Sequence, residues 1–147
     1  MEEQSTMILN AEQKIHQLVN QYRISKNLPA LVLDERISQL AREHSEAMAE
    51  NKIPLGNCGF RERIRKIALF LPSKKASENI ASYQGNPINE EIVVQFWLKS
   101  ARHRKTIQGD YNLTGMGIAR STDDDVCYFT QIFIKSYDKL KLHQNRV

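Results

Sequence analysis

The chain has 147 residues, of which 41% are hydrophobic and 26% are charged, and its formal net charge is +4. This length suits a single domain that buries a core without disulfides or metals, and the composition excludes a disordered or fibrous chain. No apolar run approaches the roughly 20 residues that cross a bilayer, so we expect no membrane span. The basic residues gather in three short clusters, at 61–66, 99–105 and 135–141, without interleaved aromatic residues. This pattern is typical of solvated helix faces and a basic tail, so we expect a monomer without a nucleic-acid partner.

The first residues and the two cysteines bear on the compartment. Residues 1–6 read Met-Glu-Glu-Gln-Ser-Thr, without the basic start and apolar core of a secretory signal. The sequence as given therefore favours a cytoplasmic protein, and an exported protein made from a longer precursor is the alternative, so the compartment stays open. A domain of this size does not need a disulfide, so reduced thiols are the favoured state of Cys58 and Cys127, and a bond between them is the alternative.

The N-terminal part of the chain predicts a helix. Asn10 and Gln13 resemble a capping box, and apolar residues then recur at helical spacing. We therefore predict a first helix over residues 11–26 and interpret residues 1–9 as an N-terminal extension.

Two further helices are predicted before residue 73. Asp34 is a good N-cap for a second helix that ends near Asn51. Helical spacing of apolar residues after Phe60 predicts a third, basic helix that ends at Pro72, because the residue before a proline is disfavoured in a helix. Residues 73–76 are interpreted as a loop.

The middle of the chain gives weaker signals. Residues 78–83 alternate too little to settle their type, and we interpret them as a loop or a short extended piece. Asn86-Pro87 offers an N-cap with proline at the first helical position, which predicts a fourth helix reaching Ser100. Residues 102–107 either continue this helix or turn away from it.

The C-terminal part predicts a β-hairpin. Residues 114–121 and 126–134 have strand composition, and the polar residues 122–125 form the turn. Both faces of the second strand are mainly apolar, so we expect it to be central and covered by helices on both sides. This predicts an α+β domain over residues 10–136, a three-layer α-β-α sandwich with a small, mainly antiparallel central sheet. Residues 137–147 are interpreted as a polar tail.

Three segments of the chain carry a family resemblance. They read Ser77-Glu78-Asn79-Ile80-Ala81, then Trp97-Leu98-Lys99-Ser100-Ala101-Arg102-His103-Arg104, and last Thr114-Gly115-Met116-Gly117-Ile118 with Tyr128-Phe129-Thr130-Gln131-Ile132-Phe133. In order, they resemble the Glu-Asn-Ile/Leu-Ala signature, the Trp-x-x-Ser-x-x-His-Arg run and the two final strands of the CAP superfamily. This superfamily comprises the cysteine-rich secretory, antigen 5 and pathogenesis-related 1 proteins, and the resemblance is to its bacterial, secretory-type branch. The match covers about residues 11–134, and it implies an α-β-α sandwich with a surface cleft in a family that is usually secreted.

The resemblance also implies a candidate site. Histidines and acidic residues line the cleft in this family, and the matching positions here are Glu78 and His103, the candidate catalytic residues. Asn57, Ser100 and Gln131 are the further candidate cleft residues. A carboxylate and a neutral imidazole within reach can form a charge-assisted pair, hold a proton near neutral pH or bind a metal. The alternative is that both residues only tie a loop to a helix through hydrogen bonds.

Asn57 marks a departure from the family pattern. Bacterial relatives carry a His-Asp/x-Gly-Phe-x-x-Arg run where this chain reads Asn57-Cys58-Gly59-Phe60-Arg61-Glu62-Arg63. An amide is a poor zinc ligand, and catalytic zinc sites keep three protein ligands, so we expect neither zinc nor another cofactor. Cys58 acting as a soft ligand beside His103 and Glu78 is the alternative.

Ser100 and His103 lie one helical turn apart and can share a helix face. A nucleophilic pair would need a third group to orient the histidine, for which Glu78 is the candidate. No nucleophile elbow or oxyanion motif accompanies them, so a hydrogen bond from Ser100 to its own backbone is the favoured interpretation.

Other polar residues are interpreted as structural. His44 lies on the apolar stripe of the second helix, which indicates a packed, hydrogen-bonded core residue. Arg63 is expected to support the turn at Asn57 through carbonyl or carboxylate contacts. His16 and His143 are expected at the surface.

The favoured function is a non-catalytic binding module for a lipid, a small ligand or a protein partner at a polar cleft, because the family includes sterol- and lipid-binding members. The alternative is a hydrolase, protease-like or directed at the cell envelope, with His103 as base and Glu78 as its orienting group. The asparagine at position 57 favours binding over catalysis.

Overall fold

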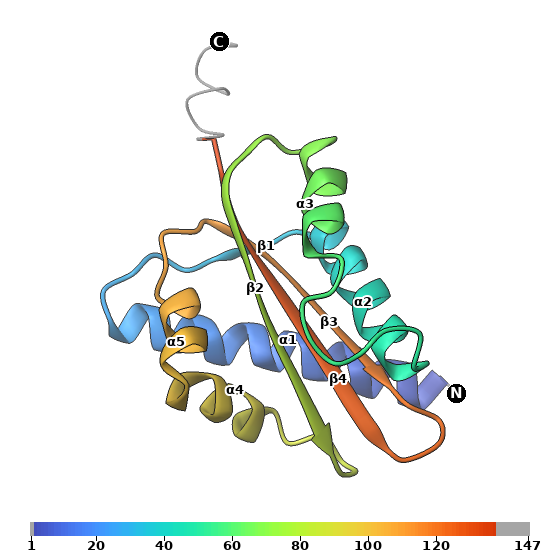
Figure 1. Cartoon of the computed structure of the whole chain (residues 1–147). Coiled ribbons are helices and arrows are strands. Elements are labelled where there is room, and N and C mark those ends of the chain that lie inside the picture. The colour runs from blue at the N-terminus through green and yellow to red at the C-terminus, as the bar shows by residue number, and fades with distance from the viewer. Residues whose placement is uncertain (1, 138–147) are drawn as a thin grey trace.

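The computed structural model describes residues 2–137, which form helices on a four-stranded sheet (Figure 1). The helices are α1 (Glu2–Ser25), α2 (Glu35–Ala49), α3 (Phe60–Ala68), α4 (Glu90–Lys99) and α5 (Ala101–Ile107). The strands are β1 (Val32–Leu33), β2 (Ser73–Gln84), β3 (Leu113–Arg120) and β4 (Val126–Ser136). Their order in the sheet is β1-β3-β4-β2, and every pairing is antiparallel except that of β1 with β3. The predicted α+β class with a mainly antiparallel sheet is confirmed.

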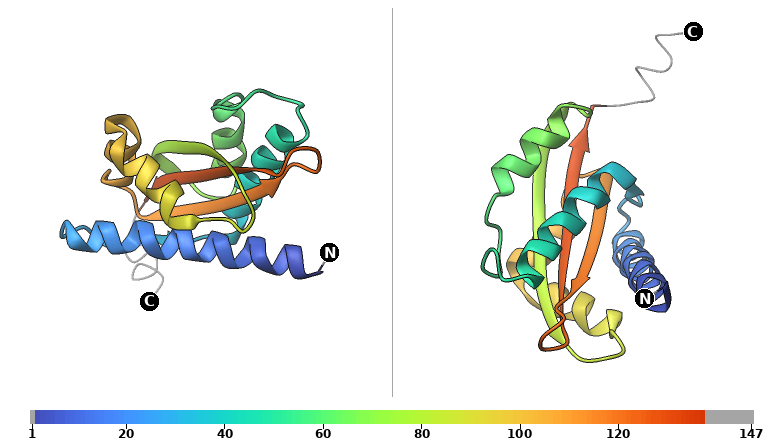
Figure 2. Two further views of the ribbon diagram at one scale, coloured as in Figure 1. Left: turned by 90° about the horizontal axis from the view of Figure 1, so that it is seen from below. Right: turned by 90° about the vertical axis from the view of Figure 1, so that its right-hand side faces the viewer.

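Helices cover both faces of the sheet, so the domain has three layers (Figure 2). On one face, Ile15 of α1 and Trp97 of α4 pack in one cluster with Phe129 and Phe133 of β4. On the other face, α2 and α3 pack in a second cluster with Ile132. As predicted, β4 is therefore an interior strand with two apolar faces.

Helix α2 lies directly against β3 because two residues of that strand have no side chain. A Cβ atom at Gly117 would overlap backbone atoms of Ala41 and Arg42, and one at Gly115 would overlap the backbone of Ile37. Only glycine therefore allows the helix to approach the strand this closely.

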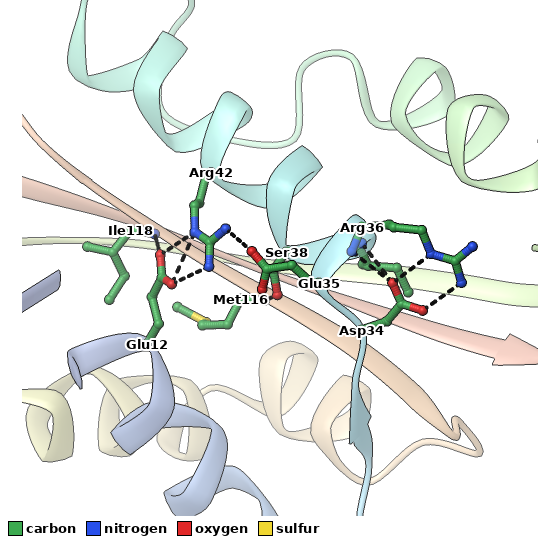
Figure 3. A network of polar contacts seen from close by, with 9 residues as sticks. Glu12, Asp34, Glu35, Arg36, Ser38, Arg42, Met116 and Ile118 are labelled. Atoms are coloured by element: carbon green, nitrogen blue, oxygen red, sulfur yellow. Dashed lines mark hydrogen bonds and ion pairs between the residues drawn. The ribbon is translucent and has the colours of Figure 1, made fainter. Parts of the chain in front are cut away.

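Side chains complete the hydrogen bonding of β3 beyond the short β1 (Figure 3). The N–H of Met116 donates to Ser38 Oγ at 3.1 Å, and the N–H of Ile118 donates to the carboxylate of Glu12 at 3.0 Å. Arg42 of α2 holds the same carboxylate through Nε and a terminal nitrogen. An edge with unpaired N–H groups invites another strand, so these contacts close the edge and tie α1 to α2.

The cap of α2 and the β-hairpin were predicted correctly. The carboxylate of Asp34 accepts hydrogen bonds from the N–H groups of Arg36 and Ile37 at 2.9 and 3.3 Å. Strands β3 and β4 pair around the polar turn at residues 122–125.

Helix α1 begins earlier than predicted, at Glu2 rather than near residue 11. Residues 5–9 contain neither proline nor glycine, and Ile8 packs against the core, so the helix continues through this segment. Asn10 lies inside the helix and does not cap it.

Helix α4 begins later than predicted. Its N-cap is Asn89, whose Oδ1 accepts a hydrogen bond from Ile92 N at 3.1 Å, and Asn86-Pro87 lies in the preceding loop. Ser100 has an extended backbone, so residues 101–107 turn away from α4 and form the separate helix α5.

Strand β2 was missed by the sequence analysis, which placed a loop at 73–76 and a loop or short extended piece at 78–83. It is a 12-residue strand that pairs with β4 from Ser73 opposite Ser136 to Gln84 opposite Val126. Its middle residues are buried on both faces, which removes the alternation that identifies a strand.

Cys127 is buried in the core and Cys58 is exposed, and both are free thiols. The predicted tail beyond Tyr137, with His143, lies outside the described residues. No helix within residues 2–137 has the length and apolar character needed to cross a membrane.

Candidate functional site

Glu78 lies on β2 with its carboxylate enclosed by α3 and the loop before it. Arg63 donates from Nε to Oε2 at 2.7 Å and from a terminal nitrogen to Oε1 at 2.6 Å. Asn57 Nδ2 also donates to Oε1, at 3.0 Å. The Glu78 side chain has 0% exposure and that of Arg63 has 10%. The predicted proximity of Asn57 and Glu78 is therefore found, and both carboxylate oxygens are occupied within the protein.

His44 of α2 joins this cluster through Arg63. One terminal nitrogen of Arg63 donates to His44 Nδ1 at 3.0 Å and to the carbonyl oxygen of Cys58 at 2.8 Å. His44 Nε2 lies 2.7 Å from the carbonyl oxygen of Gly56. A guanidinium group only donates and a carbonyl only accepts, so the ring is neutral, with its proton on Nε2. Burial lowers the pKa of His44, and the charge of Arg63 also lowers it.

As the sequence predicted, His44 lies in the core and Arg63 contacts the turn at Asn57. The sequence did not indicate that the two residues contact each other or that Arg63 contacts Glu78. Their separation of 19 residues leaves no local pattern that would have shown this. His16, which was expected at the surface, is half-buried on α1.

His103 lies on α5, beside the edge strand β2. Asn79, the neighbour of Glu78 on β2, donates to the carbonyl oxygen of His103 at 3.1 Å. Successive side chains of a strand point to opposite faces, so Glu78 and Asn79 leave β2 on opposite sides. Glu78 bonds with Asn57 and Arg63, and no hydrogen bond joins it to His103 among the described residues. The expected meeting of Glu78 and His103 in one hollow stays a prediction.

Ser100 and His103 do share a contact, as the helical spacing suggested. His103 Nδ1 lies 2.8 Å from Ser100 Oγ, and a terminal nitrogen of Arg102 lies 3.4 Å from His103 Nε2. Because arginine only donates, Nε2 accepts and the ring proton is on Nδ1, where it donates to Ser100. A general base must instead accept the proton of the serine. Burial lowers the pKa of His103, and the charge of Arg102 lowers it further.

Gln131 lies in the interior of the sheet, paired with Asn79 of β2 and Met116 of β3. It is fully buried, and its Nε2 donates to Thr114 Oγ1 at 3.1 Å. Its Oε1 has no partner among the described residues. Gln131 therefore is not a residue of a cleft with Asn57 or His103.

Two surface pockets lie elsewhere on the domain. One, of about 340 Å³, is a groove between α1 and α4, lined by Leu18, Gln21, Tyr22, Glu91, Val94, Gln95 and Leu98. The other, of about 490 Å³, follows the loop from Tyr83 to Glu91. Neither is lined by any of the five residues proposed from the sequence. Within residues 2–137, no three His, Cys, Asp or Glu side chains cluster in a way that would hold a metal ion.

The fold and the site together define the class of protein. It is a three-layer α+β domain with a buried polar junction between α2, α3 and β2. The chain belongs to the Cysteine-rich secretory protein family, the CAP family, whose model matches residues 16–133.

Comparisons with individual proteins agree with this assignment. The uncharacterized protein YkwD of Bacillus subtilis is 32% identical over 128 residues, covering 84% of this chain and 46% of the relative, so this chain spans less than half the length of that protein. The crystal structure of an extracellular SCP-domain protein from Bacillus anthracis is 27% identical with a TM-score of 0.69, over 86% of this chain and 40% of the other. An outer surface protein from Borrelia burgdorferi shares the fold with a TM-score of 0.72 at 24% identity, over 86% of this chain and 93% of the other.

Removing the charge of Glu78 is expected to destabilise the fold strongly. Glu78→Gln leaves the buried guanidinium of Arg63 without its counter-charge, so we expect the free energy of unfolding to fall by about 3 kcal/mol in urea denaturation. Glu62→Gln is the control, because it breaks the exposed pair with Arg65 and should have little effect. Equal effects of the two changes would contradict a structural role for the buried pair.

Acidification is expected to destabilise the domain through its buried histidines. Burial lowers the pKa of His44 from 6.5, so the unfolded chain takes up a proton that the folded chain resists. The contribution of neutral His44 to the free energy of unfolding is therefore fully present above about pH 6.5. It is lost as the pH falls from there through the lowered pKa of the folded state. His103 contributes with the same sign. We expect the free energy of unfolding to fall less steeply with decreasing pH in His44→Gln than in the wild type, and parallel curves would exclude this role.

Proposed function

We propose that this CAP domain is a non-catalytic binding module that takes a small amphiphilic ligand in the groove between α1 and α4. The observation that carries the proposal is the open groove itself, whose volume of about 340 Å³ falls in the range of small-ligand sites. The binding place therefore differs from the polar cleft expected from the sequence, where the contacts of Glu78 are already made within the protein.

The lining of the groove favours a ligand with an apolar body and a polar head. Val94 is buried, and Leu18 and Leu98 are half-buried, which supplies an apolar wall. Gln21 and Gln95 are exposed and provide amide groups. Glu91 is the charged residue of the lining, and its carboxylate would repel an anionic head group. The groove therefore suits a neutral or cationic amphiphile better than a carboxylate.

The hydrolase alternative is less well supported by the same contacts. Glu78 is held by Arg63 and Asn57, and among the described residues no hydrogen bond joins it to His103 that would orient the imidazole. His103 donates to Ser100, and Asn57 supplies an amide where an imidazole would favour zinc. The proposal accordingly includes neither a metal nor a nucleophile.

Ligand binding is tested with fluorescent long-chain alcohol, amine and carboxylate probes of equal chain length. We expect the alcohol and the amine to bind more tightly than the carboxylate, and Glu91→Gln to remove this preference. Leu98→Glu places a charge on the apolar wall and is expected to weaken binding of the alcohol about tenfold or more. Lys99→Glu changes the charge of the adjacent, exposed residue outside the lining and is the control. Absence of binding to the wild type, or equal losses in the two α4 variants, would overturn the proposal.

A further inference from the structure

We propose that one end of the domain, formed by the last turn of α3, the loop to β2 and the end of β4, is a docking surface for an anionic lipid bilayer. We call it the α3–β2 patch, and it consists of Arg65, Lys66, Leu69, Phe70, Lys74 and Tyr137. Its segments meet at the same end of the molecule in Figure 1, where α3 leads into β2 and β4 ends beside the start of β2. This surface is separate from the α1–α4 groove.

The apolar part of the patch centres on Leu69. Its exposure of 88% exceeds that of the other large exposed hydrophobic residues of the described chain, so it projects into solvent just after α3. Phe70, the next residue after Leu69, is half-buried, and Tyr137 is exposed. Single exposed apolar residues are common on protein surfaces. This leucine differs because Lys66 and Phe70 flank it in sequence, and Lys74 and Tyr137 lie at the same end of the domain.

The charged part of the patch is basic. Lys66 and Lys74 are exposed, and neither forms an ion pair with the residues that the structure describes. Lys74 Nζ lies 5.1 Å from the centroid of the Tyr137 ring, and the Arg36 guanidinium lies 4.5 Å from that of Phe70. Positive charges beside aromatic and aliphatic groups match the interface of a bilayer that contains anionic lipids.

The sequence that follows Tyr137 carries charge of the same sign. Residues 138–147 contain Lys139, Lys141 and Arg146 against the single acid Asp138. Lysine and arginine residues near an anionic membrane surface add to its attraction one by one. The patch therefore continues in sequence into a net basic segment.

A bilayer fits these features better than a soluble polyanion does. A polyanion needs only the cations, and it gains nothing from the exposed side chain of Leu69. A lipid interface can bind the basic, aliphatic and aromatic groups of the patch together. Lipid phosphates pair with lysine, the leucine side chain inserts at the boundary of the acyl chains, and the tyrosine ring lies between these two regions.

The test is co-sedimentation of the full chain with vesicles made of equal parts phosphatidylglycerol and phosphatidylcholine, compared with vesicles of phosphatidylcholine alone. We expect binding to the anionic vesicles that weakens with salt. The double variant Lys66→Glu with Lys74→Glu should lower the partition coefficient by about tenfold or more. Leu69→Ser should lower it several-fold at unchanged charge.

Matched controls separate this surface from the rest of the domain. Lys14→Glu with Lys105→Glu makes the same change of net charge at exposed sites on α1 and α5, and Ile24→Ser removes an exposed apolar side chain from α1. Both should bind vesicles as the wild type does, and so should Leu98→Glu in the groove. Losses in the controls equal to those of the patch variants, or no preference for anionic vesicles, would overturn the proposal. Full competition by soluble polyphosphate together with unchanged binding of Leu69→Ser would show an anion site instead and would overturn it as well.

Discussion

The buried ion pair between Arg63 and Glu78 connects the helices and the strand of the polar junction between α2, α3 and β2. The side chain of Glu78 has no exposure to solvent, so its charge has to be matched within the protein. Arg63 matches it with two short hydrogen bonds and also reaches His44 of α2 and the carbonyl oxygen of Cys58. One guanidinium group thus joins α2, α3, β2 and the loop that carries Asn57. The ion pair therefore fixes α3 against β2 in addition to the apolar packing of Ile67.

The sheet separates this closed junction from the open groove. Glu78 and His44 lie on the face covered by α2 and α3, whereas α1 and α4 form the groove on the opposite face. The polar residues that the family resemblance singles out form hydrogen bonds within the protein. Glu78 bonds to Arg63 and Asn57, and His103 contacts Ser100. One accessible groove lies where α1 and α4 meet over apolar side chains, and we propose it as the binding place.

The sequence predicted those features that depend on local chemistry. The cap at Asp34 and the two apolar faces of β4 need only the residues of their own segments. The length of β2 and the direction of Glu78 depend on pairing with β4, which brings residue 78 opposite residue 132. A one-residue change in that register would turn the carboxylate toward the other face. The family motif identified Glu78 and His103 as residues of interest, but a motif contains no information on which face each side chain takes.

Hydrogen bonds from arginine hold His44 and His103 as neutral rings with different tautomers, and the tautomers can be measured directly. Long-range proton–nitrogen NMR correlations report directly which ring nitrogen carries the proton, before and after addition of equimolar zinc. We expect protonated Nε2 in His44 and protonated Nδ1 in His103, with both spectra unchanged by zinc. A proton on Nε2 of His103, or zinc-induced shifts of both rings, would contradict these tautomers and the absence of a zinc site.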